Sequence, residues 1–127
     1  MCIRDRNKYY VCDVAMRNML VRSRDSDIGH ILENVVYLEL KRRYAEVYVG
    51  QCGADGEVDF VAIRDGMPAY YQVAQTTLDD QVLARELGPL RQIKDNYPKY
   101  LLTLDEVFGE MNYEGIQKIN VLKWLLS

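Results

Sequence analysis

The chain has 127 residues, a length that suits one domain built around a single hydrophobic core. Its hydrophobic fraction of 49% and charged fraction of 28% are those of a folded globular protein and exclude a disordered or fibrous one. A formal net charge of -3 argues against a domain that holds nucleic acid through bulk positive charge. A local basic site is still compatible with this balance.

The cysteines and the apolar runs indicate the compartment. Cys2, Cys12 and Cys52 are too scattered for a CxxC metal or redox pair, so no disulfide framework is predicted. No apolar run has the length of a membrane span, and the first residues lack the hydrophobic segment of a signal peptide. These features predict a reduced, cytoplasmic setting with no membrane partner.

The first part of the chain carries weak structural signals. Residues 1–7 show no clear period and are expected to be a tail or an artefact, which leaves one domain over 8–127. Within that domain we expect a short strand, a brief helix and a polar loop, over 8–12, 13–21 and 22–27 respectively.

A longer helix is predicted over 28–43, with Ser26 or Asp27 available as its cap, because apolar residues recur there at helical spacing. Glu33 falls on the edge of the apolar arc and Glu39 falls inside it. A carboxylate inside the arc must be paired or lie at an opening, since an isolated buried charge is too costly. The basic run Lys41 to Arg43 favours the negative end of the helix dipole, and this interpretation is preferred to a phosphate-binding patch.

The remaining pattern alternates strands and helices. Three consecutive strands, expected to form a meander, are predicted over 46–50, 57–63 and 69–74, with turns at Gly53/Gly56 and Asp65-Gly66. A helix over 80–94, which Gly88-Pro89 should kink or divide, precedes a central strand over 98–104, a strand over 115–119, and a helix over 121–126 capped by Asn120. This order predicts an α/β fold in which helices flank a mixed central sheet.

Three polar residues on these elements could assemble a site. Glu33 lies on the first long helix, Asp59 on the second strand of the meander and Gln72 on the third. A helix and two neighbouring strands can bring such side chains together, and Mg²⁺ prefers oxygen ligands of this kind. A bound Mg²⁺ or Mn²⁺ ion would activate water and clamp a phosphodiester oxygen.

The sequence around these residues resembles a known family. Three short runs, Gly29-xxx-Glu33, Val58-Asp59-Phe60 and Tyr71-Gln72-Val73, resemble the PD-(D/E)XK nuclease-like core. Longer runs in the same order resemble the uncharacterised carboxy-terminal domain of predicted AAA-type P-loop ATPases of bacteria and archaea: Glu33 to Leu40, Tyr71 to Ala74, Arg85-Glu86, and Asp95 to Lys99.

This resemblance implies a restriction-endonuclease-like fold for residues 8–127 and a parent protein that also contains an ATPase module. No GxxxxGK[ST] motif occurs in the chain, so the ATPase module is absent from it. The resemblance implies that module as a partner, and DNA and a second copy of the chain are further candidate partners. Mg²⁺ or Mn²⁺ is the implied cofactor if the domain is catalytic.

The third motif departs from the family pattern. An active nuclease would carry Glu-x-Lys where this chain has Gln72-Val73-Ala74. The lysine normally orients the attacking water and offsets phosphate charge, which alanine cannot do. Arg85 could replace the lysine, and Glu57 could add an acid on the strand face of Asp59, although an ordinary ion pair and an exposed strand-end acid explain them as well.

Three functional hypotheses follow. The preferred one is a degenerate nuclease-like domain of an AAA-type ATP-binding protein that serves as a recognition or regulatory module with little or no catalysis. The first alternative is a metal-dependent DNA endonuclease that uses Glu33, Asp59 and Gln72 as ligands and Arg85 in place of the lysine. The second alternative is a structural or dimerisation domain.

Overall fold

The structure, a computed structural model, describes residues 25–53 and 56–127. The tail, strand and helix expected over 1–21 lie outside the described residues, as does the first half of the loop expected over 22–27. No helix in the described part of the chain is both long enough and apolar enough to cross a membrane.

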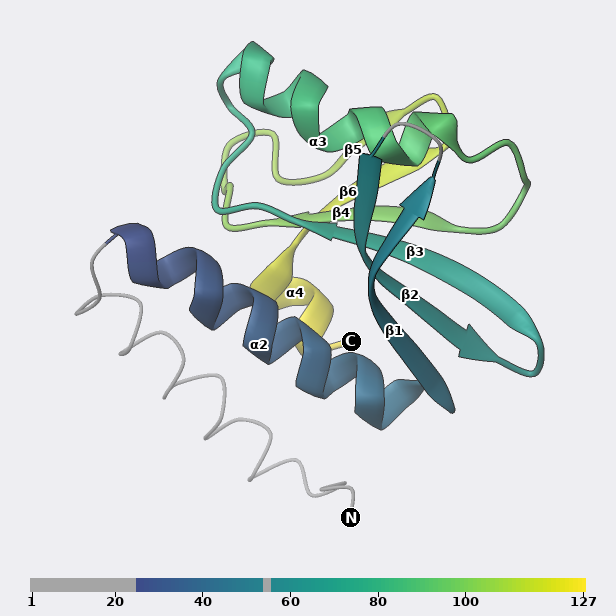
Figure 1. The fold of residues 1–127 in the computed structure, drawn as a ribbon. Coiled ribbons are helices and arrows are strands. Elements are labelled where there is room, and N and C mark those ends of the chain that lie inside the picture. Colours follow the sequence, from purple (N-terminus) through teal and green to yellow (C-terminus); the bar gives the residue numbers. More distant parts are fainter. Residues whose placement is uncertain (1–24, 54–55) are drawn as a thin grey trace.

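The described residues form an α/β fold around one mixed sheet (Figure 1). In chain order the elements are α2 (Asp25–Arg43), β1 (Glu46–Gly53), β2 (Gly56–Arg64), β3 (Met67–Val73), α3 (Asp80–Gln92), β4 (Lys99–Thr103), β5 (Met111–Tyr113), β6 (Ile116–Asn120) and α4 (Val121–Leu125). The sheet has six described strands in the order β1-β2-β3-β4-β6-β5. This confirms the predicted mixed sheet flanked by helices.

The sheet has an antiparallel half and a parallel half that meet at β3. β1, β2 and β3 are antiparallel neighbours, which confirms the predicted meander. β3, β4 and β6 run parallel, and β5 returns antiparallel to β6. β4 therefore lies in the middle of the sheet, as its nearly continuous apolar sequence predicts.

Helices cover both faces of the sheet (Figure 1). On one face α2 and α4 pack against a core that includes Leu32, Val36, Tyr71, Leu102 and Trp124. On the other face α3 packs against a smaller core of Val58, Leu87, Leu90, Leu101 and Ile116. Burial of these apolar side chains from water is the main favourable term in holding the three layers together.

Local signals at turns and caps are confirmed where the structure describes them. Asp65 and Gly66 both have positive φ, 55° and 76°, as the tight turn between β2 and β3 requires. Asn120 caps α4, and its Oδ1 accepts from the N–H groups of Leu122 and Lys123 at 2.9 and 3.3 Å.

One expectation about a helix limit is wrong. α2 begins at Asp25, so the last residues of the expected loop over 22–27 are helical and neither Ser26 nor Asp27 is the cap. Of the two alternatives for Gly88-Pro89, a kink or a division, the division does not occur, because α3 is one helix that continues through Pro89. Leu87 and Leu90, on either side of Gly88-Pro89, are 1% and 0% exposed in the same core, and this packing offsets the lost backbone bond.

One short strand was not predicted. β5 has three residues, all at least partly exposed, and therefore carries no hydrophobic period. It forms because Met111 to Tyr113 pair with Ile116 to Lys118 after a turn in which Glu114 and Gly115 have positive φ.

A buried ion pair fastens the loops at the carboxyl ends of the parallel strands. Lys118 on β6 is 1% exposed, and its Nζ lies 2.8 Å from Oδ2 of Asp105, which follows β4. Asp105 also accepts hydrogen bonds from the Thr76 hydroxyl, the Thr77 hydroxyl and the Thr77 N–H. Burial raises the pKa of Asp105, but the hydrogen bonds from Lys118, Thr76 and Thr77 lower it by more, so the net shift is downward.

We expect Lys118→Met to lower the free energy of unfolding at pH 7 by about 3–5 kcal/mol, because it leaves the Asp105 carboxylate buried without its counterion. The folded-state pKa of Asp105 lies below the ordinary 3.8, so the pair stabilises the fold above that pH. The difference between the two proteins should therefore narrow as the pH falls below 3.8. Urea unfolding between pH 3 and 7 measures it.

Lys123→Met is the matched control, since the Lys123 side chain is 71% exposed and lies 3.6 Å from an exposed Glu110. Equal losses in the two variants would show that the buried pair has no special role.

Candidate functional site

Asp59 on β2 makes hydrogen bonds to Gln72 and to its neighbour Val73 on β3. Pairing between these strands is regular from Arg64–Met67 to Phe60–Tyr71. At the next position the Asp59 N–H donates to Oε1 of Gln72 at 2.6 Å, and the Val73 N–H donates to Oδ2 of Asp59 at 2.9 Å. The two side chains thus accept backbone N–H bonds at the place where regular pairing between β2 and β3 ends.

Gln72 also connects β3 to α3. Its side-chain Nε2 donates to the carbonyl oxygen of Glu86 at 3.2 Å, and the residue is only 4% exposed. Both polar atoms of the buried amide are therefore satisfied by backbone groups, one from β2 and one from α3. As a result Gln72 cross-links three elements.

The β1–β2 hairpin changes direction beside Asp59. Gly50, with φ 67°, occupies the register position opposite Asp59, between the pairs Val49–Phe60 and Gln51–Val58. Val58 and Phe60 are two residues apart on β2, so in a regular strand their side chains would point to the same face of the sheet. Instead Val58 packs in the core under α3 and Phe60 packs in the core under α2. The strand must twist sharply between them, and Asp59 lies at that twist.

Glu33 approaches the same region from α2, and Glu86 approaches it from α3. The Glu33 side chain is 46% exposed, with Oε2 3.9 Å from Nδ1 of His30. The Glu86 side chain is 19% exposed. Burial raises the pKa of Glu86, the negative charges of Asp59 and Glu33 raise it further, and Arg85 lowers it.

The structure thus brings the three predicted residues to one region and adds Glu86 to them. The sequence signal for Glu86 was present in the Arg85-Glu86 run, but its charge favoured an ordinary ion pair. What makes it part of the site is its position on α3, over the end of β3, which the sequence does not reveal. The Glu57 side chain lies outside the described residues, so its expected role stays a prediction.

Ala74 occupies the position of the motif lysine, and Arg85 is the residue expected to replace that lysine. Ala74 follows β3 and donates its N–H to the Leu102 carbonyl oxygen at 3.0 Å, so it only continues the sheet pairing. The Arg85 side chain is 73% exposed, and its Nε lies 3.9 Å from Oε2 of Glu86. Arg85 stands at the solvent side of the site and contacts an acid of that site.

The acids of this region are near enough to repel one another but are not gathered into a coordination shell. Among the described side chains, which leave out those of residues 25–27 and 51–57, no three His, Cys, Asp or Glu lie close enough together to hold a metal ion. The described part of this region therefore consists of three acids and one buried amide.

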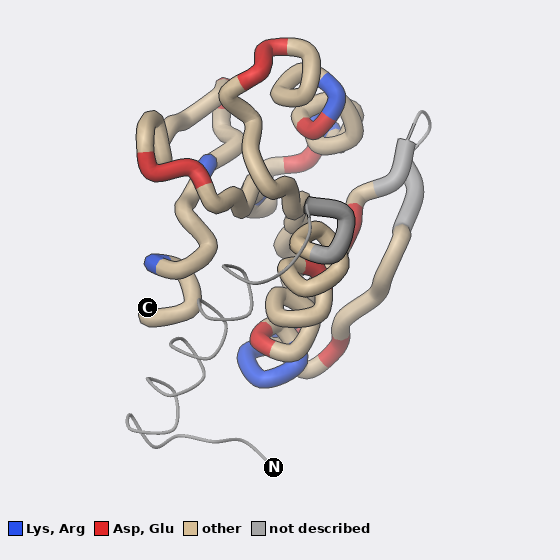
Figure 2. Tube along the Cα trace, turned by 90° about the vertical axis from the view of Figure 1, so that its left-hand side faces the viewer, with Lys and Arg blue, Asp and Glu red and all other residues tan. Residues whose placement is uncertain are grey.

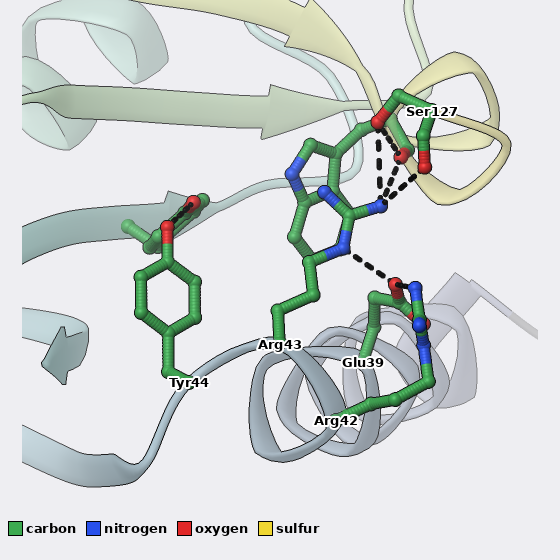
Figure 3. Close-up of polar contacts among 7 residues, drawn as sticks. Glu39, Arg42, Arg43, Tyr44 and Ser127 are labelled. Atoms are coloured by element: carbon green, nitrogen blue, oxygen red, sulfur yellow. Dashed lines mark hydrogen bonds and ion pairs between the residues drawn. The ribbon is translucent and has the colours of Figure 1, made fainter. Parts of the chain in front are cut away.

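The acid predicted to lie inside the apolar arc of the first helix is paired, as required. Glu39 is 6% exposed and accepts from both Arg42 and Arg43, each with a shortest distance of 2.5 Å (Figure 3). Burial raises the pKa of Glu39, but the two arginines lower it by more, so the net shift is downward. The basic run at the end of α2 is thus built into the helix packing.

The comparisons with known proteins give a relative but no family. Over 120 residues the chain is 33% identical to an uncharacterized protein of Haemophilus influenzae, and the match covers 94% of this chain and 29% of that protein. The chain therefore spans less than a third of the length of the relative. No family description matches the chain, and no solved structure does.

We expect Glu86→Gln to raise the free energy of unfolding at pH 7 by about 0.5–2 kcal/mol, because it removes a partly buried charge that Asp59 and Glu33 repel. The folded-state pKa of Glu86 lies above the ordinary 4.5, so the wild type loses stability as the pH rises from 4.5 through that raised pKa. The stability gain of the variant should accordingly be absent below pH 4.5 and complete at pH values above the raised pKa. Thermal or urea unfolding at several pH values tests both points.

Glu106→Gln provides the matched change at an exposed acid outside this region. A lower stability of Glu86→Gln at pH 7 would mean that attraction to Arg85 outweighs the repulsion.

Proposed function

We propose that this chain is a PD-(D/E)XK nuclease-like domain that has lost efficient phosphodiester cleavage and serves as a recognition or regulatory module of an AAA-type ATP-binding protein. The order of elements supports the proposal, since Glu33 lies on the helix before the meander, Asp59 on the second strand and Gln72 on the third. The hydrogen bond from the Asp59 N–H to the Gln72 side chain agrees with two motif residues that belong to one site.

The main support for the loss of cleavage is the set of hydrogen bonds that the Gln72 side chain makes. Its Oε1, the atom that would face a metal, accepts from the Asp59 N–H, and its Nε2 donates to the Glu86 carbonyl oxygen. A glutamate could accept the first bond but could not donate the second. The amide therefore fits a structural cross-link better than a metal ligand.

The second support comes from the charge around the site. Ala74 stands where the motif lysine would offset phosphate charge, and Arg85, the expected substitute, lies with its Nε 3.9 Å from Oε2 of Glu86. A phosphodiester entering here would meet the charges of Asp59, Glu33 and Glu86 with little compensation. Cleavage needs that compensation in the transition state, whereas a binding role elsewhere on the domain does not.

The proposed link to a larger protein agrees with the comparison. The match covers nearly the whole of this chain but only 29% of the Haemophilus influenzae protein. Such a difference between the two coverages is expected when one domain of a longer protein matches this chain. The ATPase module as the partner rests on the resemblance of the motif runs.

One observation favours the alternative of a metal-dependent nuclease. The raised pKa of Glu86 reflects repulsion among acids after the effect of burial, and a divalent cation would relieve that repulsion. In this alternative Mg²⁺ or Mn²⁺ would be held by Glu33 and Asp59, with Arg85 offsetting phosphate charge.

The deciding experiment measures cleavage of plasmid and single-stranded DNA with Mg²⁺ and with Mn²⁺. We expect no cleavage by the wild type and none by Asp59→Ala, because the site lacks its lysine and its second motif carboxylate. Gln72→Glu combined with Ala74→Lys rebuilds the motif and should produce weak metal-dependent cutting if the scaffold is nuclease-like.

Asp59→Ala in the rebuilt background is the control and should abolish the new activity. Metal-dependent cutting by the wild type that Asp59→Ala removes would replace the proposal with the nuclease alternative. Each variant is first compared with the wild type by circular dichroism, because the Gln72 change also removes the bond to α3.

A further inference from the structure

A cavity lined by arginine lies at the far end of α2 from the acids. It has a volume of about 350 Å³ and is lined by Arg42, Arg43, Tyr44 and Arg64. The first two residues end α2, Tyr44 follows them, and Arg64 ends β2. Figure 2 shows the basic residues gathered in the last turn of this helix. Three of the four lining side chains are therefore cationic.

Two of these arginines are held in place by contacts to the rest of the fold. Arg43 lies with its guanidinium carbon 4.6 Å from the centre of the Trp124 ring and donates to the Trp124 carbonyl oxygen at 2.7 Å (Figure 3). Arg42 and Arg43 both bind Glu39. Fixed guanidinium groups lose little conformational entropy when an anion binds, which favours a specific site.

Arg64 supplies a charge of a different kind. Its side chain is exposed, and its guanidinium carbon lies 5.5 Å from the centre of the Tyr44 ring. Within the described residues Arg64 makes no ion pair with a carboxylate. The Tyr44 ring under it is itself fixed by a 2.8 Å hydrogen bond between the hydroxyls of Tyr44 and Tyr71.

The charges around the cavity leave it positive. The Glu39 carboxylate binds both Arg42 and Arg43 and offsets one of the three arginine charges. Glu46 begins β1 nearby in sequence, but it pairs in register with Ile63 and accepts from the Tyr48 hydroxyl. Because successive side chains of β2 point to opposite faces, Ile63 and its partner lie on the face away from Arg64.

We propose that this cavity binds a phosphate group, with Arg64 as the residue that contacts it together with the fixed arginines at the end of α2. Guanidinium groups present paired N–H donors that match the oxygens of a phosphate, which suits a small, polar, arginine-lined hollow. The phosphate could belong to a free small molecule or to the backbone of a nucleic acid.

This site is separate from the acidic region. Arg64 and Asp59 are five residues apart on β2, about 16 Å along the strand. Arg42 and Glu33 are nine residues apart on α2, about 14 Å along the helix. The inference therefore stands whether or not the acidic region ever cleaved a phosphodiester, and mutations at one site should leave the other unchanged.

The test is isothermal titration calorimetry of the full chain with inorganic pyrophosphate and, separately, with a short single-stranded oligonucleotide, both at constant ionic strength. We expect saturable binding of at least one ligand that Arg64→Gln weakens about tenfold, the scale of one lost charge-assisted hydrogen bond. Arg91→Gln removes the same charge from an exposed position on α3 and should leave the affinity within about twofold of the wild type.

The outcomes distinguish the two sources of phosphate and also show whether the inference is wrong. Arg64-dependent binding of pyrophosphate identifies a site for free phosphate compounds, and Arg64-dependent binding of the oligonucleotide alone identifies a nucleic-acid backbone. No saturable binding of either ligand, or an equal effect of Arg64→Gln and Arg91→Gln, overturns the inference. Both arginines are exposed, so melting curves without ligand should confirm that neither change unfolds the protein.

Discussion

The fold depends on β3, which must pair with strands of opposite direction on its two sides. On one side it runs antiparallel to β2, and on the other it runs parallel to β4 as far as the pair Val73–Leu102. The side chains of Gln72 and Asp59 accept from the N–H groups of Asp59 and Val73, respectively, where regular pairing with β2 ends. Because Gln72 also binds α3, the same side chain fixes the sheet junction and the helix above it.

This constraint gives a physical reason for an amide at this position. The Gln72 amide accepts from the Asp59 N–H and donates to the Glu86 carbonyl oxygen, and a neutral amide can do both. A carboxylate here would lose the bond to α3 and add a charge beside Asp59 and Glu86. The residue that stabilises the fold is thus a poor residue for holding a metal, which connects stability to the proposed loss of cleavage.

Much of the fold could be predicted because the signals were local. The meander followed from alternating strands separated by Asp65-Gly66, and α4 followed from Asn120 as a cap. Pairing of Glu39 followed from the cost of burying a lone carboxylate. The limits of α2 and the continuity of α3 through Pro89 could not be predicted, because packing of Leu87 and Leu90 decides the second and no local rule contains it.

The site was predicted less completely than the fold. Glu33, Asp59 and Gln72 came from motif positions on three elements, but Glu86 joins them only through the placement of α3 over the end of β3. For the same reason, the role predicted for Gln72 differs from the one that its contacts indicate. Its sequence position indicates a ligand, whereas its contacts are those of a cross-link, and contacts between distant segments are not visible in one sequence.

The distribution of charge along α2 bears on both proposals. Glu33 lies near the middle of α2 and the fixed arginines lie with Glu39 at its end, where the contact of Arg43 with Trp124 ties the helix to α4. A phosphate is repelled by uncompensated carboxylates and attracted by guanidinium groups, so the two ends of this surface favour opposite ligands. In an efficient phosphodiesterase the positive charge would lie beside the acids, at the reacting phosphate. Here the arginine-lined cavity lies about 14 Å away along the helix, which suits a domain that holds phosphate without cutting it.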